Sequence, residues 1–228
     1  MSIADELLLR NSDLVRNAAI RLPVCLCVDA SYSMHNGHRM QQVNAGVRRF
    51  IQEIGLNPYA VDSVELCIIS FGGERARVEQ EFALVRSMQY RDIVPSGKTP
   101  MGQALTLAMD KLAERNELYE HHGISAYHPW LIIISDGEAT DDLAPAVARL
   151  LEMEKKREVK VLCVGIGDEA NDLARCKADG EVIQLKDLVL DNFFAWLSKS
   201  MSEQSVQSPT MDLEIPGYDQ LQQLDKRR

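Results

Sequence analysis

Five oxygen-bearing side chains follow apolar segments of the chain and could together hold a metal ion. Two carboxylates and three hydroxyls are hard oxygen donors, which suit Mg²⁺, Mn²⁺ or Ca²⁺ rather than softer metals. Two of the serines are two residues apart, so in an extended turn both hydroxyls face one point. We therefore expect one hard divalent cation, with Mg²⁺ as the first choice. The five residues are Asp29, Ser31, Ser33, Thr99 and Asp136.

Segments dense in apolar residues alternate along the chain with segments of helical periodicity. Continuous apolar runs are typical of strands buried on both faces of a parallel sheet. They occupy residues 22–30, 63–73, 129–135 and 159–167, with a short fifth candidate at 181–185. Apolar residues at helical spacing predict helices over 39–54, 100–112, 143–156 and 187–201. The alternating segment 76–85 is predicted as an antiparallel edge strand.

This order of elements predicts an α/β fold, with a doubly wound, mainly parallel sheet flanked by helices on both faces. In such folds ligands bind at the carboxyl ends of the strands, beside the point where the strand order reverses. The sequences DASYS and SDGE follow two predicted strands, and GKT precedes a helix. Thr99 is predicted to cap that helix, with Pro100 in its first position. Only the fold would bring these three clusters together.

Length and charge favour one acidic domain with extensions. Of the 228 residues, we assign 21–201 to the domain, 1–20 to an N-terminal helical extension and 202–228 to a flexible tail. A net charge of −9 repels phosphates, so neither nucleic acid nor an anionic membrane is the expected partner. Arg39, Arg48 and Arg49 could form a local basic patch, but their helical spacing favours a solvated face.

The cysteines point to a reducing compartment. Cys25, Cys27, Cys67 and Cys163 all lie inside apolar runs, where a thiol behaves as a small buried hydrophobe. The C-x-C spacing of the first two differs from the usual zinc spacing. Unpaired interior thiols, together with the lack of a recognisable signal peptide, predict a cytoplasmic protein.

The pattern D-x-S-x-S, then T-P-M-G-x-A-L, then S-D-G resembles the metal-ion-dependent adhesion site of von Willebrand factor A domains, over roughly residues 20–200. In that family the hydroxyls contact the metal and the aspartates often act through water. A carboxylate from a partner protein completes the metal shell. The segments LPVCLCVDASYSM, SGKTPMGQAL and PWLIIISDGEATDD also resemble the cytoplasmic bacterial A-domain proteins encoded with tellurite-resistance and stress genes. That resemblance implies phosphorylation-based stress signalling with kinase-like or phosphatase-like partners.

The leading hypothesis is therefore a metal-dependent protein-interaction module rather than an enzyme. The rival is a metal-dependent phosphotransfer or hydrolytic enzyme, but dehalogenase-like phosphatases need a second aspartate where Ser31 stands. A phosphate-accepting receiver domain would need an acidic pair at the first strand end. The GKT sequence is not a P-loop, because Asp92 stands where the first glycine is required.

Several polar residues near these motifs have simpler interpretations. Asp141 and Asp142 are expected to favour a helix N-terminus, with indirect metal contact as the alternative. Lys98 is either a solvated loop charge or a contact for an acidic partner. We expect Glu138 to face solvent and the histidines to be solvated loop residues. The histidines are His35, His38, His121, His122 and His128.

Overall fold

The computed structural model describes residues 17–167, 171–185 and 190–206. These residues contain a six-stranded sheet with the order β3-β2-β1-β4-β5-β6. All neighbouring strands are parallel except β2 and β3, so β3 is the antiparallel edge strand that the sequence predicted. The strands are β1 (Leu22–Asp29), β2 (Val64–Gly72), β3 (Arg75–Leu84), β4 (Trp130–Ser135), β5 (Lys160–Ile166) and β6 (Ile183–Leu185).

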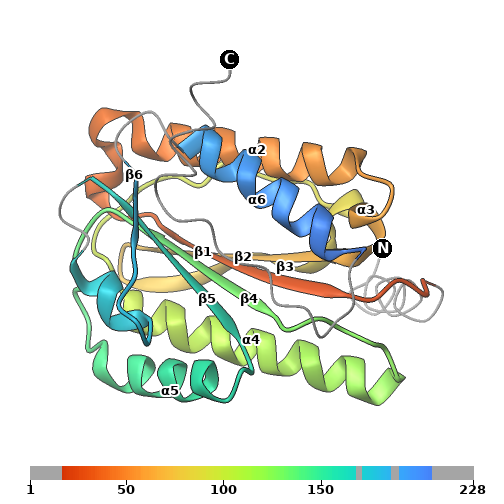
Figure 1. Ribbon diagram of the computed structural model, residues 1–228. Helices are drawn as coiled ribbons and strands as arrows, with labels where there is room; N and C mark the ends of the chain where they lie inside the picture. Colours follow the sequence, from red (N-terminus) through yellow and green to blue (C-terminus); the bar gives the residue numbers. More distant parts are fainter. Residues whose placement is uncertain (1–16, 168–170, 186–189, 207–228) are drawn as a thin grey trace, which may run out of the picture.

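Helices cover both faces of the sheet, as Figure 1 shows, which confirms the predicted fold class. The four long helices are α2 (Arg39–Leu56), α4 (Met101–His122), α5 (Ala144–Lys155) and α6 (Leu190–Gln204). A short α3 (Ala60–Ser63) and three 3-10 helices lie in the connections: η1 (Tyr32–His38), η2 (Val85–Ser87) and η3 (Asn171–Cys176). The helix α4 runs ten residues beyond the predicted 112, since its later turns carry mostly polar side chains and bury only Tyr119.

Alternate residues of β1 supply two separate hydrophobic cores. Val24 and Leu26 belong to the core that packs under α2 and α6. Cys25 and Cys27 point to the other face and belong to the core under α4 and α5. Every residue of β1, β2 and β4 is buried, as expected for central strands covered on both sides.

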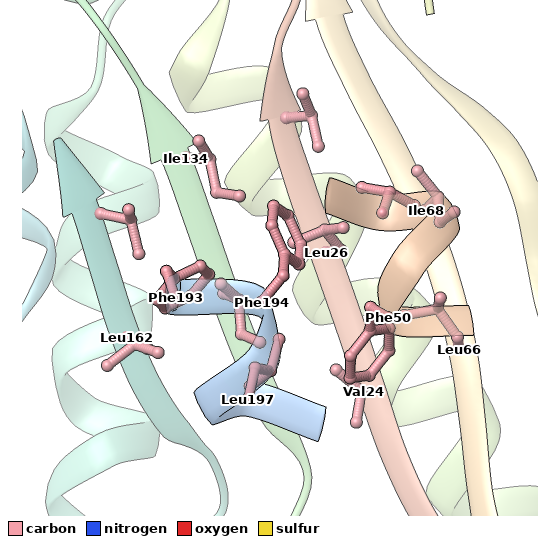
Figure 2. Packing of buried hydrophobic residues seen from close by; sticks show 14 of the residues in the cluster. Val24, Leu26, Phe50, Leu66, Ile68, Ile134, Leu162, Phe193, Phe194 and Leu197 are labelled. Atoms are coloured by element: carbon pink, nitrogen blue, oxygen red, sulfur yellow. The ribbon is translucent and has the colours of Figure 1, made fainter. Parts of the chain in front are cut away.

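The helix α6 packs its aromatic residues directly onto the strands. Phe193, Phe194 and Leu197 lie over the strands in Figure 2, with Phe194 next to Leu26. Gly46 of α2 allows α2 and α6 to approach each other closely, because a Cβ at this position would lie 2.1 Å from the Cδ2 of Phe194. The two helices therefore contact each other along a face that a single larger residue would block.

The strand order reverses between β1 and β4. The chain passes from β1 to β2 through α2 on one face, and reaches β4 through α4 on the other face. The register pairs Val28 with Ile134, so Asp29 and Ser135 end their strands side by side. This reversal is where a ligand site is expected in an open α/β sheet.

The cysteine prediction is confirmed within the described residues. All five cysteines there are buried free thiols, including Cys176, which lies outside the apolar runs of the sequence. Burial raises the pKa of the Cys163 thiol well above its usual value. No three His, Cys, Asp or Glu side chains in the described part of the chain gather as a metal-binding group. A cation site there would need other oxygen donors, such as hydroxyls, beside at most two of these side chains.

Two predicted segments lie largely outside the described residues. The N-terminal extension is described only from residue 17, and the tail only to residue 206. The last helix runs to Gln204, three residues past the boundary at 201, and both Met201 and Gln204 are buried. Among the described residues, no helix has the length and apolarity needed to cross a membrane.

Candidate metal centre

Asp29 is a fully buried carboxylate at the end of β1. Its Oδ1 accepts a hydrogen bond of 2.7 Å from the Ser31 backbone N–H. Its Oδ2 accepts one of 2.5 Å from the Ser135 hydroxyl. No lysine or arginine of the described residues pairs with it, unlike the other buried acid of the β strands, Glu65, which contacts Arg21 and Arg115. Burial raises the pKa of Asp29 to about 6, against the two hydrogen bonds that lower it. The site therefore holds a carboxylate that lacks a countercharge.

A chain of hydroxyl hydrogen bonds links the first loop to the end of β4. The hydroxyls of Ser31 and Ser33 lie 2.8 Å apart. The Ser33 hydroxyl then donates to Oδ1 of Asp136 at 2.7 Å. Ser33 belongs to η1, which the buried side chain of Met34 anchors to the core. The structure thus brings together Asp29, the two serines and Asp136, residues that are up to 107 apart in the sequence.

Thr99 is positioned by its backbone rather than by its hydroxyl. Its N–H donates to the Thr140 hydroxyl at 3.0 Å, and the Thr140 N–H donates back to the Thr99 carbonyl at 2.9 Å. The loop before it joins the first loop, because the Tyr32 N–H donates to the Gly97 carbonyl at 3.0 Å. Thr99 is 7% exposed. Thr140 is therefore a positioning residue that the sequence patterns did not reveal.

Two glycines allow this loop to dock at the end of β2. Gly97 has φ +59°, in the left-handed region that favours glycine. A Cβ on Gly97 would lie 2.5 Å from the Cα of Gly73. The Lys98 N–H donates to the Gly73 carbonyl at 3.1 Å, and the Ser96 N–H donates to the Ala30 carbonyl at 2.7 Å. Backbone hydrogen bonds thus hold the path to Thr99 against the residues that follow β1 and β2.

The predicted cap of α4 is wrong by one position and in its chemistry. The helix begins at Met101 after Pro100, and neither Pro100 nor Thr99 caps it with a side chain. Asp141 does so instead, because its Oδ1 and Oδ2 accept the N–H groups of Gly102 and Gln103, both at 2.9 Å. A carboxylate there also complements the positive end of the helix dipole. The expected helix-end role of Asp141 is confirmed, but on α4 rather than on the helix that follows it.

Asp142 fills that second role. Its Oδ1 accepts from the Ala144 N–H at 3.1 Å, where α5 begins. Glu138 is exposed, as expected. Lys98 is also exposed and lies 3.9 Å from Glu74. In η1, the ring of His35 packs against that of Tyr32 with centroids 5.2 Å apart, and the ring of His38 hydrogen bonds to the side chain of Gln41.

The expected solvated face of α2 is wrong for its first residue. Arg39 turns inward and its Nη1 lies 2.6 Å from Oδ2 of Asp136, with side-chain exposures of 24% and 0%. Arg48 pairs with Asp92 and Arg49 with Glu53, both on the surface, so the prediction is confirmed for those two. Helical spacing treats the three arginines alike. Only the position of β4 beneath the start of α2 distinguishes Arg39.

The donors present fit a hard divalent cation. Oxygen is the only ligand type in the cluster, and the buried Asp29 carboxylate has two hydrogen bonds but no cationic partner among the described residues. Carboxylate and hydroxyl oxygens are ligands that Mg²⁺ and Mn²⁺ accept. A cation would also offset the burial of Asp29 that raises its pKa.

Comparison with known proteins identifies the family. The model of the von Willebrand factor type A domain matches residues 24–188, and the chain belongs to this family. No curated protein shows significant similarity to the chain.

Solved structures share the fold at low identity. One is the vWF domain of the type V pili tip protein Mfa5 from Porphyromonas gingivalis. It has 12% identity, a TM-score of 0.62, and coverage of 86% of this chain and 99% of that one. The pilus adhesin SpaC from Lactobacillus rhamnosus GG has the same identity and TM-score, with coverage of 81% and 30%. A von Willebrand factor type A protein from Catenulispora acidiphila has 17% identity, a TM-score of 0.56, and coverage of 80% and 43%. This chain thus spans less than half the length of SpaC and of the Catenulispora acidiphila protein.

Proposed function

We propose that this domain binds a partner protein through a divalent cation at the carboxyl edge of its sheet. The observation that carries the proposal is the buried Asp29 carboxylate, which has no cationic partner among the described residues. It accepts the Ser31 backbone N–H, and the Ser31 hydroxyl leads through that of Ser33 to Asp136. The cation would be Mg²⁺, with Mn²⁺ or Ca²⁺ as alternatives. Its ligands would be Asp29, Ser31, Ser33, Thr99 and Asp136.

The arrangement of these residues suits binding rather than catalysis. A bound cation would supply a Lewis-acidic point for an incoming carboxylate. Asp29 and Asp136 would hold it together with the neutral hydroxyls, and a ligand position left to the partner would accept an aspartate or glutamate. The rival phosphotransfer or hydrolytic function lacks a comparable basis. Ser31, hydrogen bonded to Ser33, occupies the position of the second acid that such chemistry would use.

The cellular setting follows from the sequence resemblance. We infer that the protein acts in the bacterial cytoplasm, in tellurite-resistance or related stress signalling, with kinase-like or phosphatase-like partners. The buried free thiols support a reducing compartment. Neither nucleic acid nor a membrane is the expected partner of a chain with net charge −9.

Metal titration tests the site itself. Calorimetry with Mg²⁺, Mn²⁺ and Ca²⁺ should show one site in the wild type and none in Asp29→Ala or Asp136→Ala. The matched control is Asp110→Ala, which removes an exposed carboxylate of α4 that pairs with Arg149. Equal affinities in all four proteins would show that the cation binds elsewhere.

Affinity capture tests the partner. The partner that the wild-type domain captures from cell extract in Mg²⁺ should not be captured when chelator replaces Mg²⁺. The Thr99→Ala variant should likewise fail to capture it in Mg²⁺. Tyr32→Ala should also weaken capture, because this ring is 70% exposed between the two metal serines, and exposed aromatic residues often dominate interfaces. Tyr59→Ala removes a ring that is 64% exposed near the opposite end of α2, and should have no effect. Full capture by Thr99→Ala in chelator would assign the interaction to another surface.

A further inference from the structure

Arg39 occupies a built position beside the candidate metal centre. It is the first residue of α2, and its guanidinium reaches Oδ2 of Asp136 while Ser33 contacts Oδ1 of the same carboxylate. The end of β5 leaves room for it, because a Cβ on Gly167 would lie 3.0 Å from Nη2 of Arg39. Asp136 therefore offers one oxygen to the hydroxyl chain and the other to a fixed positive charge.

The formal charges around the centre make this arginine consequential. Asp29 and Asp136 are both negative when ionised, and the three hydroxyls are neutral. With Arg39 included, the metal-free cluster has one net negative charge. A divalent cation then leaves one net positive charge, whereas without Arg39 the loaded cluster would be neutral. Attraction for a partner carboxylate thus depends on the arginine.

Other charged groups near the edge do not replace it. Lys98 lies beside Glu74, and both side chains are strongly exposed to solvent, which screens them. Both oxygens of Asp141 accept N–H groups at the start of α4. Glu138 is exposed. Among the described residues, Arg39 is the cation that directly contacts a member of the hydroxyl and carboxylate cluster.

We propose that Arg39 sets the charge of this site, lowering its affinity for the divalent cation while raising the affinity of the loaded site for a carboxylate. The inference rests on the proposed metal-binding function. If Arg39 only supported the local structure, its loss would weaken both the binding of the cation and the binding of the carboxylate. A charge-setting role predicts effects of opposite sign, because the arginine repels the incoming cation and attracts the incoming anion.

The experiment measures the two steps separately, at one fixed pH of about 8 for all variants. Mn²⁺ affinity is measured by electron paramagnetic resonance. Acetate is then titrated into the Mn²⁺-loaded protein, and its binding is followed by the water-proton relaxation that the ion causes. The variants are Arg39→Gln, which removes the charge but keeps amide donors, and Arg39→Lys, which keeps the charge. Arg48→Gln, on the exposed surface of the same helix, controls for the loss of one positive charge.

We expect Arg39→Gln to bind Mn²⁺ at least roughly tenfold more tightly, which is the scale of the repulsion between a divalent ion and a unit charge about 6 Å apart in the dielectric of bulk water. Its Mn²⁺-loaded form should bind acetate several-fold more weakly. Arg39→Lys and Arg48→Gln should stay close to the wild type in both steps. In chelator, Arg39→Gln should melt below the wild type, since Asp136 loses its cationic partner. Excess Mn²⁺ should raise its melting temperature by more than it raises that of the wild type.

The outcomes separate this inference from the function on which it rests. Unchanged or weaker Mn²⁺ binding by Arg39→Gln, beside a functional wild-type site, overturns the inference alone. The same holds if acetate affinity does not fall, or if Arg39→Lys behaves like Arg39→Gln. Absence of Mn²⁺ binding in both the wild type and Arg39→Gln overturns the proposed metal site, and the inference with it.

Discussion

Replacing Gly97 by alanine should move the loop that carries Thr99. The left-handed φ of +59° costs an alanine about 1 to 2 kcal/mol. The new Cβ would also lie 2.5 Å from the Cα of Gly73, whereas carbon atoms in contact are about 3.5 to 4.0 Å apart. The neighbouring atom is backbone at the end of β2, so the loop has to give way.

The added cost of this close contact is about 1 to 3 kcal/mol, as for other overpacked sites. Gly123→Ala is the matched control. Gly123 ends α4 with φ +65° and has no atom within 4 Å of the new Cβ, so it incurs the backbone strain alone. Both alanines gain the same small advantage from a restricted unfolded chain, which cancels in the comparison.

Denaturant unfolding in chelator and Mn²⁺ titration together measure the effect. Gly97→Ala should be about 1 to 3 kcal/mol less stable than Gly123→Ala. It should also bind Mn²⁺ at least about tenfold more weakly, since displacing one ligand by about 1 Å forfeits at least about 1.4 kcal/mol. Gly123→Ala should bind Mn²⁺ like the wild type. If the two variants unfold alike and bind Mn²⁺ alike, the loop does not position a ligand and the reasoning is refuted.

Three further predictions concern stability. Gly46→Ala should lower the free energy of unfolding in urea by about 1 to 3 kcal/mol, because the new Cβ would lie 2.1 Å from Phe194. Gly55→Ala in the same helix meets no atom within 4 Å and should raise that free energy by about 0.5 to 1 kcal/mol. Equal effects would contradict the close packing of α2 and α6. In chelator above pH 6, Asp29→Asn should stabilise the fold by up to about 3 kcal/mol. Burial raises the pKa of Asp29 in the folded protein to about 6, so above that pH the ionised carboxylate is less stable in the folded than in the unfolded chain. A lower melting temperature of Asp29→Asn would refute this. Removing residues 207–228, whose sequence lacks apolar periodicity, should leave the melting temperature nearly unchanged, and a large fall would place part of them in the fold.

The sequence alone determined the layers of this protein. Buried strands appear as continuous apolar runs and helices as periodic ones, because each pattern reflects the local geometry of one element. The five candidate ligands were also visible, since each stands at the end of such an element. For Asp29 and Asp136 this is enough to predict that they share one edge of a parallel sheet.

The tertiary structure alone decided how these residues are held. Ser135 contacts Asp29, and Thr140 holds Thr99, through hydrogen bonds between residues that are distant in sequence. The cap of α4 comes from Asp141, a residue 40 positions beyond Met101 at the start of that helix. Such contacts depend on which loops meet at the strand ends, and no pattern within one element encodes that meeting.

Arg39 shows the same limit most clearly. Its helical spacing with Arg48 predicts one solvated face, and a periodic pattern has no means of distinguishing the two. The difference arises because η1 turns the start of α2 toward the end of β4, where the buried carboxylate of Asp136 attracts the guanidinium. The charge of the candidate centre is thus a property of the assembled fold, because it depends on a contact between residues 97 apart in the sequence.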